Sequence, residues 1–400
     1  MKIAFYFEAS NKDGGFLKHQ LTIAEILNNI KFSDIEFKFI ASNTIAEKIL
    51  KNKNFNVVLY KSNWIDKIFN VLYYSKFLIF LLKKIKIQNK FETFLRKLDV
   101  DIIFFPGASR FSIFCDNINF VSYINEIHHL IRPDLPEYKN SGTSYDFNSR
   151  EQTIDHCAKK SMNLILDSNS SKREITKNYR CHEKKVHIIP YFSNLVEQSI
   201  KDLEIKNENL KEIINNKTPF YFYPAQFWPH KNHIYILNSL KILKDTFKKE
   251  FLFIFCGHRK QNFDFIKKKI IEMKLEKNIL ILDYLTDGEI IKLYQNCKAL
   301  VMPTLIGHIC LPVVEAFYFK VPIFYTKGLL DDEYKEYVNE IDIDDPNDLA
   351  NALINIKDET IKEKINQAHK YFFENLAKDK LELLYKKLLV NLRNKLNFYK

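Results

Sequence analysis

Short apolar runs alternate with helical segments along the first half of the chain. Most of these runs are β-branched or aromatic and show no polar alternation, which is typical of strands buried on both faces of a parallel sheet. A helix over residues 16–29 follows the first run. The predicted strands are residues 3–7, 35–40, 56–60, 101–105, 119–123, 163–166 and 186–189.

The second half repeats this alternation after a polar stretch, residues 194–217, that is rich in Lys, Asn and Glu. The pattern predicts two doubly wound α/β domains, because strand–helix alternation builds parallel sheets covered by helices. The domains are residues 1–193 and 218–375, joined by the linker 194–217 and followed by a basic helix, 376–400. The second set of strands is 220–223, 251–255, 279–282, 299–302 and 322–325, with helices over 233–243 and 287–296.

The net charge and the cysteine pattern limit which partners and cofactors the protein is expected to bind. The net charge of +12 suits a phosphate or lipid-headgroup partner, although a general drift towards Lys, Ile and Asn explains it equally well. No nucleic-acid-binding module is present, so we expect no nucleic-acid partner. The six cysteines are scattered and form no CxxC pair, which argues against a zinc site and a disulfide framework and favours a reducing cytosol.

No segment has the length of a membrane-spanning helix or the pattern of a signal peptide. The most apolar stretch, residues 71–82, is short and is interrupted by Lys76. It lies within residues 64–98, which mix aromatic and aliphatic side chains with many lysines. Such a segment either lies in a lipid headgroup layer or packs on the sheet with its lysines outward.

Four of the eight glycines directly follow predicted strands: Gly15, Gly107, Gly257 and Gly307. A ligand can approach the backbone closely there, since no Cβ intervenes, but a tight turn is the alternative reading at each position. Neither GxGxxG nor GxxxxGK[ST] occurs, so neither a dinucleotide site nor a P-loop is supported.

The second half holds the densest set of candidate chemical groups. Residues 223–233, YPAQFWPHKNH, place Lys231 at a strand-to-helix turn, where an ammonium group can neutralise a diphosphate leaving group. Residues 307–315, GHICLPVVE, place Glu315 early in a helix, where a carboxylate can accept hydrogen bonds from both hydroxyls of a ribose.

Three segments of this half resemble the retaining glycosyltransferases of family 4, which have the GT-B fold. They are YPAQFWPHKNH, DYLTDGEIIKLYQNCKALVMPT and GHICLPVVEAFYFKVPIFYT, in the family's order. The resemblance implies that Lys231 binds the donor diphosphate and Glu315 the nucleotide ribose. It also implies that backbone N–H groups around Leu311 hold the phosphates, and that residues 307–310 lie against the donor sugar.

Two positions depart from the family pattern. The family usually has a Glu eight residues before Glu315, where this chain has Gly307, and an Arg five residues before the lysine, where it has Gln226. Members with a similar QFWPHKN loop often share the glycine. These changes bear on the donor-sugar contacts, to which His308 adds a candidate side chain.

The first half resembles the family more weakly. Gly15, in Gly14-Gly15-Phe16, matches a loop that approaches the donor phosphates and the acceptor. Asn125 and Glu126 occupy the positions of a His-Asp pair that the family carries after a strand. His128 and His129 follow shortly after and are the alternative candidates for binding donor or acceptor, beside a structural role.

The resemblance implies a hexosyltransferase that moves a sugar from a nucleoside diphosphate donor to a glycan or lipid-linked saccharide in surface polysaccharide or O-antigen synthesis. It implies no metal and no other cofactor, so Asp-Val-Asp at 99–101 and Asp-Ile-Asp at 342–344 are read as strand flanks. The expected location is the cytoplasm, at the inner face of the bacterial inner membrane, with peripheral contact to anionic lipid. The alternatives are a non-catalytic GT-B-fold partner and a sugar-nucleotide epimerase of the same fold.

Overall fold

The computed structural model describes residues 1–8, 14–64, 66, 68, 80, 84, 89–139, 147–197, 204–283, 285–355 and 358–399. The chain divides into two units, each built on its own parallel sheet. Unit 1 comprises Met1–Pro133, Tyr138–Pro190 and Lys378–Lys400. Unit 2 comprises Asp134–Glu137 and Tyr191–Ala377.

The described strands of unit 1 form one sheet in the order β3-β2-β1-β4-β5-β6-β7. Every pair is parallel; Ile3, for example, lies opposite Phe37 on β2 and opposite Ile102 on β4. The strand order reverses between β1 and β4, so this is the switch point of the sheet. The strands are β1 (Lys2–Phe7), β2 (Glu36–Ala41), β3 (Val57–Leu59), β4 (Ile102–Phe105), β5 (Asn119–Tyr123), β6 (Asn163–Leu166) and β7 (Val186–Ile188).

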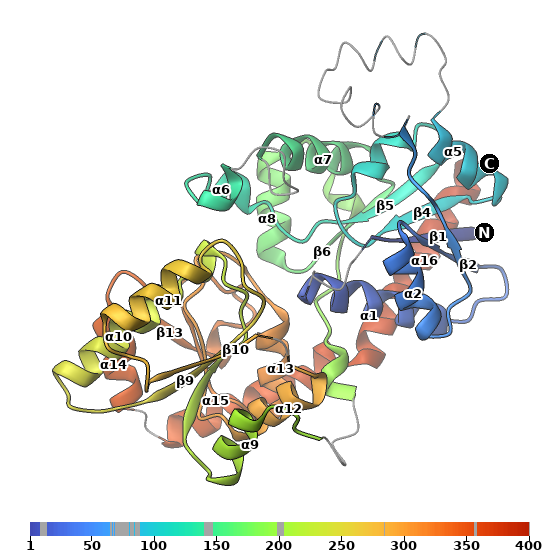
Figure 1. The fold of residues 1–400 in the computed structure, drawn as a ribbon. Helices are drawn as coiled ribbons and strands as arrows, with labels where there is room; N and C mark the ends of the chain where they lie inside the picture. The colour runs from blue at the N-terminus through green and yellow to red at the C-terminus, as the bar shows by residue number, and fades with distance from the viewer. Residues whose placement is uncertain are drawn as a thin grey trace. The chain divides into compact units, whose positions relative to one another are not determined.

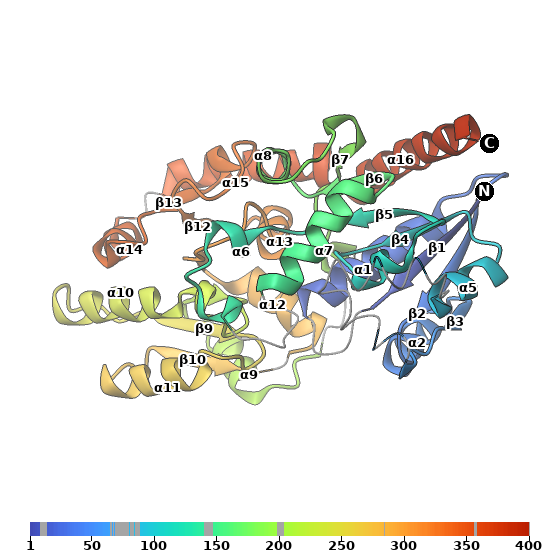
Figure 2. The same ribbon diagram turned by 90° about the horizontal axis from the view of Figure 1, so that it is seen from above.

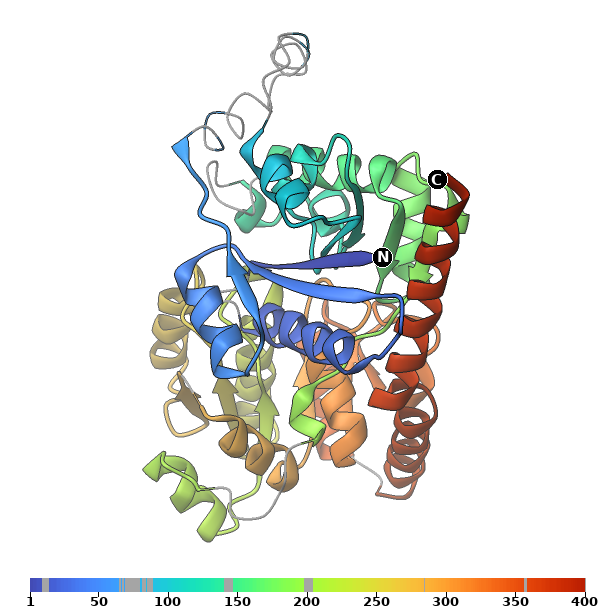
Figure 3. The same ribbon diagram turned by 90° about the vertical axis from the view of Figure 1, so that its right-hand side faces the viewer.

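Helices cover both faces of this sheet (Figure 1). One face carries α5, α7 and α8, and the other carries α1, α2 and α16, with α1 and α16 side by side (Figure 3). The helices are α1 (Gly15–Asn29), α2 (Thr44–Asn52), α5 (Lys90–Lys97), α6 (His128–Ile131), α7 (Phe147–Lys160), α8 (Asn169–Asn178) and α16 (Lys378–Tyr399).

Alternating side chains of the central strands explain why both faces need cover. Phe5 of β1 stacks on Phe104 of β4, with their ring centroids 5.6 Å apart, on the face that α16 covers. Tyr6, the next residue, packs against Phe91 of α5 on the opposite face. Because successive strand residues point to opposite faces, an uninterrupted apolar run is the pattern of a sheet buried on both sides.

Unit 2 repeats the architecture, with a described sheet in the order β10-β9-β8-β11-β12-β13. Its switch point lies between β8 and β11, which pair in parallel through Phe222 and Leu300. The strands are β8 (Phe220–Tyr223), β9 (Leu252–Cys256), β10 (Ile279–Leu282), β11 (Leu300–Met302), β12 (Ile323–Thr326) and β13 (Asn339–Ile341).

Figure 2 shows α10, α11 and α14 on one side of the second sheet and α12, α13 and α15 on the other. Helix α12 begins with a capping box, in which the Thr286 hydroxyl and the Glu289 carboxylate satisfy each other's backbone N–H groups. The helices are α9 (Glu208–Asn215), α10 (His233–Asp245), α11 (Phe263–Glu272), α12 (Asp287–Asn296), α13 (Leu311–Phe319), α14 (Pro346–Ile354) and α15 (Asp358–Tyr371).

The last helix of the chain, α16, belongs to unit 1 although it follows unit 2 in sequence. A π-helical turn, Phe372–Leu376, separates it from α15. Helix α16 packs on α1, and its Arg393 forms an ion pair with Asp34, two residues before β2. The chain therefore returns to its first unit after it has formed the second.

The predicted strands are confirmed to within about two residues, with one omission, β13. The linker predicted over 194–217 contains a short 3-10 helix, Asn194–Glu197, and helix α9 in its described part. The backbone N–H groups of Lys206 and Asn207 donate to Glu289, at 3.0 and 2.8 Å, so this end of the segment is anchored on α12.

Most of the basic segment 64–98 lies outside the described residues. Of its described part, α5 turns Phe91 and Leu95 into the core and leaves Arg96 half exposed. No helix in the described ranges combines the length and the apolar character needed to cross a membrane.

Candidate functional site

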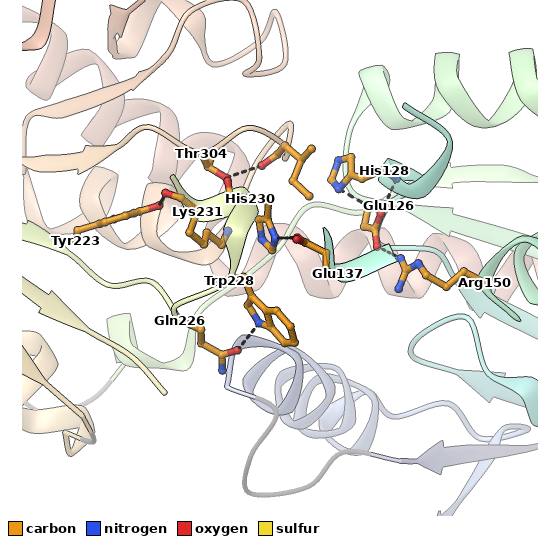
Figure 4. Close-up of polar contacts among 11 residues, drawn as sticks. Glu126, His128, Glu137, Arg150, Tyr223, Gln226, Trp228, His230, Lys231 and Thr304 are labelled. Carbon is orange, nitrogen blue, oxygen red and sulfur yellow. Dashed lines mark hydrogen bonds and ion pairs between the residues drawn. The ribbon is translucent and has the colours of Figure 1, made fainter. Parts of the chain in front are cut away.

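The loop that follows β8 presents Lys231 at the switch point of unit 2. Pro229 starts a 3-10 helix, Pro229–Lys231, and Asn232 then takes the left-handed conformation, with φ 52°, before α10 begins. The Tyr223 hydroxyl donates to the Lys231 carbonyl at 2.5 Å, which ties the end of this turn to the end of β8 (Figure 4). The backbone of Lys231 is therefore fixed from within its own strand–loop–helix unit.

Gly257, at the end of β9, allows this loop to approach closely. A Cβ on Gly257 would lie 2.5 Å from the Ala225 carbonyl oxygen and 2.7 Å from the Gln226 nitrogen. Both neighbours are backbone atoms, so a side chain here would displace the loop. At this glycine the close approach is made by the protein's own backbone, whereas the sequence offered a ligand or a tight turn as the two readings.

The electrostatic setting of Lys231 favours an anion. Burial lowers the pKa of its ammonium group, and the nearby Glu137 carboxylate acts in the opposite direction. Among the described residues it forms no ion pair with a carboxylate, and its only hydrogen bonds there are made by its backbone. A desolvated cation that forms no ion pair is costly, and an anionic ligand would offset that cost.

The loop that follows β11 is tied directly to the lysine loop. The backbone N–H of Leu305 donates to the His230 carbonyl at 2.8 Å, and the Thr304 hydroxyl reaches the same oxygen at 3.3 Å (Figure 4). His230 Nδ1 also contacts the Glu137 carboxylate, on the short segment that groups with unit 2. The two loops at the switch point are thus one hydrogen-bonded assembly.

Gly307 has a φ of 115°, a conformation that L residues with a side chain rarely adopt. Its carbonyl accepts a hydrogen bond from the Tyr325 hydroxyl at 2.8 Å, which holds the peptide in place. This backbone does not suit the Glu that the family usually carries here. The departure noted in the sequence is therefore accompanied by a glycine-specific loop conformation.

The neighbouring His308 is committed to the loop, since its Nδ1 donates to the Leu329 carbonyl at 3.0 Å. Helix α13 then begins at Leu311, directly after Cys310, whose side chain does not cap it. Pro312 has no N–H, and the Val313 and Val314 N–H groups point at the Cys310 carbonyl. The first turn of α13 places its positive dipole end at the switch point.

Glu315 is buried, and both of its carboxylate oxygens accept hydrogen bonds. The Ser193 hydroxyl donates to Oε1 and the Tyr294 hydroxyl donates to Oε2, each at 2.6 Å. Both partners are buried, Ser193 directly before the 3-10 helix Asn194–Glu197 and Tyr294 on α12. These bonds fix the carboxylate in one orientation, and each oxygen keeps a further lone pair for a ligand.

Gln226 and Trp228 form a small cluster near the start of the lysine loop. The Trp228 indole N–H donates to the Gln226 side-chain oxygen at 3.0 Å (Figure 4). The ammonium group of Lys260 lies over the Trp228 ring, 5.3 Å from its centroid. Gln226, at the position where the family usually has an Arg, therefore orients Trp228.

The remaining sequence candidates lie in unit 1. Gly15 is the first residue of α1, and Asn125 follows β5 with its side-chain oxygen buried. Glu126 accepts from the His128 backbone N–H at 2.6 Å and forms an ion pair with Arg150 (Figure 4). Burial lowers the pKa of the Arg150 guanidinium to about 10. Glu126 is thus engaged with α6 and α7.

His129 is fully buried, and its Nε2 lies 3.0 Å from Glu151 of α7, which also accepts from the Tyr179 hydroxyl. Burial lowers the pKa of His129, although Glu151 acts in the opposite direction. The Nε2 contact ties His129 to α7.

The structure brings together Gln226, Lys231, Gly307, His308, Leu311 and Glu315 on the loops and helices that follow β8 and β11. Sequence reasoning missed Ser193 as a partner of Glu315, because no motif links residues so far apart along the chain. Within the described ranges, no three His, Cys, Asp or Glu side chains are grouped so that they could hold a metal ion.

Comparison with known structures identifies the fold class. A glycosyltransferase from Rickettsia africae matches 97% of this chain and 97% of its own, with 18% identity and a TM-score of 0.64. Anabaena HepE, solved with UDP-glucose, matches 98% of this chain and 100% of its own, with 13% identity and a TM-score of 0.71. WaaG, a glycosyltransferase involved in lipopolysaccharide biosynthesis, matches 96% and 98%, with 12% identity and a TM-score of 0.65. The chain has the GT-B fold.

Sequence comparison relates part of the chain to a known family. Residues 204–375 match the family model described as glycosyl transferases group 1. The O-antigen chain mannosyltransferase RfbU of Salmonella typhimurium is 26% identical over 231 residues, which cover 54% of this chain. The match spans 58% of the length of that relative.

Proposed function

We propose that this protein is a retaining glycosyltransferase that moves a hexose from a nucleoside diphosphate donor to a glycan or lipid-linked saccharide acceptor in surface polysaccharide synthesis. The observation that carries the proposal is that two groups follow the strands at one switch point. Lys231 is a desolvated ammonium group that forms no ion pair within the described residues, and Glu315 is a carboxylate held by two hydrogen bonds. The family match and the UDP-glucose bound to the Anabaena neighbour support the donor class.

In the proposed reaction, the bond between the anomeric carbon and the diphosphate oxygen breaks, and the diphosphate leaves with the electron pair. The acceptor hydroxyl oxygen forms the new glycosidic bond, and its proton passes to the departing diphosphate. The ammonium of Lys231 and the N-terminus of α13 would stabilise the charge that develops on the diphosphate. Glu315 would accept hydrogen bonds from the ribose hydroxyls. The positive charge needed for departure is then supplied by the chain, and we propose that no metal ion takes part.

We also propose that the protein works in the cytoplasm at the inner face of the inner membrane, where lipid-linked acceptors are found. The net charge of +12 supports peripheral contact with anionic lipid. RfbU, the relative named for O-antigen synthesis, supports the surface-polysaccharide context.

The first test is a metal-free panel of UDP, GDP, CDP and their common sugar conjugates, read by thermal shift and calorimetry. A ligand that binds only the folded protein must raise the melting temperature. We expect one nucleoside diphosphate family to do so, and we expect release of that diphosphate from its sugar conjugate when acceptor glycan is supplied. No shift with any of them would refute the donor assignment. Binding without turnover in the presence of acceptor would favour a non-catalytic partner.

The residue assignment is tested by Lys231→Ala and Glu315→Ala. Each should lower transfer about 100-fold or more, because each removes an interaction with the donor, while thermal unfolding still shows a folded protein. Lys241→Ala is the matched control, since Lys241 is a half-exposed lysine on α10 paired with Asp245. Wild-type turnover in both site variants would disprove the assignment.

A further inference from the structure

A group of basic and polar side chains gathers at the amino ends of β6 and β7 in unit 1. Asn163, the first residue of β6, donates from Nδ2 to His187 Nε2 on β7 at 2.6 Å and to Asn391 Oδ1 on α16 at 2.9 Å. Its Oδ1 accepts from the ammonium group of Lys395, also on α16, at 2.6 Å. Two strands and the last helix of the chain therefore meet at one amide (Figure 2).

Two lysines of this group bind carbonyl oxygens of the short segment that leads into β6. Lys185, directly before β7, donates to the Ser161 carbonyl at 3.1 Å, and Lys395 donates to the Met162 carbonyl at 3.3 Å. Burial lowers the pKa of Lys185, and the charge of Lys395 lowers it further. Burial and Lys395 lower the pKa of His187 in the same way. The two ammonium groups and the imidazole thus lie close enough to affect one another.

No carboxylate pairs with this cluster within the described residues, since Lys185, His187 and Lys395 form no ion pair there. Glu183, two positions before Lys185, is instead paired with Lys172 at 3.5 Å. Both lysines of the cluster are partly buried. Two ammonium groups that are desolvated and repel one another are costly to the folded state, and an anion placed between them would offset that cost.

The cluster also holds hydrogen-bond donors that the described protein does not use. The Ser161 hydroxyl is buried without a partner, and only 4% of the residue is exposed. Of the three N–H groups on each ammonium, Lys395 uses two and Lys185 uses one within the described residues. His187 Nε2 accepts from Asn163, so the neutral imidazole carries its proton on Nδ1, where it can donate.

Capping of the two carbonyl oxygens accounts for the position of the lysines but leaves these donors open. Buried polar groups are normally satisfied, so the unpartnered hydroxyl of Ser161 beside two cations indicates a ligand. The ligand must supply negative charge and several acceptors.

We propose that Ser161, Lys185, His187 and Lys395 form a binding site for a phosphate monoester group. Such a group carries a charge of about −2 at neutral pH and three strong acceptor oxygens, which match two ammonium groups and donors from all four side chains. Asn163 would hold the imidazole and the Lys395 ammonium group in place. A free phosphate ester and the phosphate of a lipid headgroup share this chemistry, and the inference does not depend on the proposed function.

The test titrates the full chain with glycerol 3-phosphate near neutral pH and at low ionic strength, read by isothermal titration calorimetry. Wild type is compared with Ser161→Ala and Lys395→Met. Lys51→Met is the matched control, because Lys51 is an exposed lysine of the same unit, paired with Glu47 on α2. Lys231→Ala is also measured, since a phosphate can be attracted to the lysine loop of unit 2. Sedimentation with phosphatidylcholine vesicles, with and without phosphatidic acid, tests a lipid phosphate.

We expect wild type, Lys51→Met and Lys231→Ala to share a site of equal affinity, and Ser161→Ala and Lys395→Met to bind about 10-fold more weakly, as is typical for loss of a hydrogen bond to a charged group. Ser161→Ala keeps every charge and removes a hydroxyl without a partner in the protein, so misfolding does not explain its loss of affinity. Selective binding to phosphatidic acid that Lys395→Met abolishes would identify a lipid as the source, and binding of glycerol 3-phosphate without that preference would identify a soluble ester.

Three results would overturn the proposal. The first is equal affinity in wild type and Ser161→Ala. The second is loss of binding in Lys231→Ala, which would place the phosphate in unit 2. The third is binding of neither glycerol 3-phosphate nor phosphatidic acid to wild type.

Discussion

Replacing Glu8 with Gln should make the protein more stable in alkaline solution and leave it nearly unchanged in acid. The folded protein holds Glu8 at a pKa of about 7, against 4.5 for an unperturbed glutamate, because its surroundings are desolvated. A raised pKa means that the folded state favours the protonated form. The stability that this form supplies is therefore complete below about pH 4.5 and is lost as the pH rises through about 7. Gln has nearly the same shape but no charge to bury at any pH.

The size of the effect follows from the two pKa values. At about 1.4 kcal/mol for each pH unit between them, ionising Glu8 costs the folded wild type about 3 kcal/mol at pH 8.5. At pH 5 the cost is below about 1 kcal/mol, since Glu8 is almost entirely protonated in the folded state. A unit of this size gains about 2–4 °C in melting temperature for each kcal/mol, so Glu8→Gln should melt about 8 °C higher than wild type at pH 8.5.

Differential scanning calorimetry at pH 5, 6, 7 and 8.5 measures the difference in melting temperature between Glu8→Gln and wild type. Where two unfolding transitions are seen, the one that shifts on substitution is used. The comparison with wild type at each pH cancels the other titrating groups. Glu47→Gln is the control, because its partly exposed ion pair is worth at most about 1 kcal/mol at any of these pH values. A difference in melting temperature that does not grow with pH would refute the reasoning, and so would a destabilised Glu8→Gln protein at pH 8.5.

Two further predictions concern unit 2. Tyr294→Phe and Ser193→Ala should each weaken nucleoside diphosphate binding about 10-fold, because each removes a 2.6 Å hydrogen bond that orients one oxygen of Glu315. Calorimetry with the 2′-deoxy nucleotide should show a smaller loss of affinity on substitution. An equal loss with both nucleotides would contradict a role through the ribose. Gly257→Ala should lower the free energy of unfolding by about 1–3 kcal/mol and weaken nucleotide binding, because its Cβ would lie 2.5 Å from the Ala225 carbonyl oxygen. An unchanged melting temperature and nucleotide affinity would show that the loop moves away at no cost.

The strands could be predicted from the sequence because a sheet covered on both faces leaves an unbroken apolar run. The run at Phe220–Tyr223, on the central strand β8, is such a case, and the predicted and observed bounds are the same. Strand β13 was missed because its sequence, Asn-Glu-Ile, is short and polar and lies at the edge of the sheet, where one partner suffices. A strand of three residues with two polar side chains carries little of the apolar pattern on which the prediction depends.

The residues of the candidate site could likewise be predicted only in part. Lys231 and Glu315 could be found because a strand end followed by a helix start places them in a local pattern. The groups that orient or surround them could not, because Ser193 and Glu315 are 122 positions apart and meet only through packing. Glu8 carries no motif, and its environment arises only when the Ser109 loop folds over the end of β1.

The two switch points present different titratable groups. In unit 2, Lys231 is a desolvated ammonium group close to the first turn of α13, a setting that favours an anion. In unit 1, Glu8 is a carboxyl group whose pKa is raised by burial, so an anion placed beside it would raise that pKa further. A doubly wound sheet offers the same backbone geometry in both units, and the side chains that follow its central strands set the charge at each switch point.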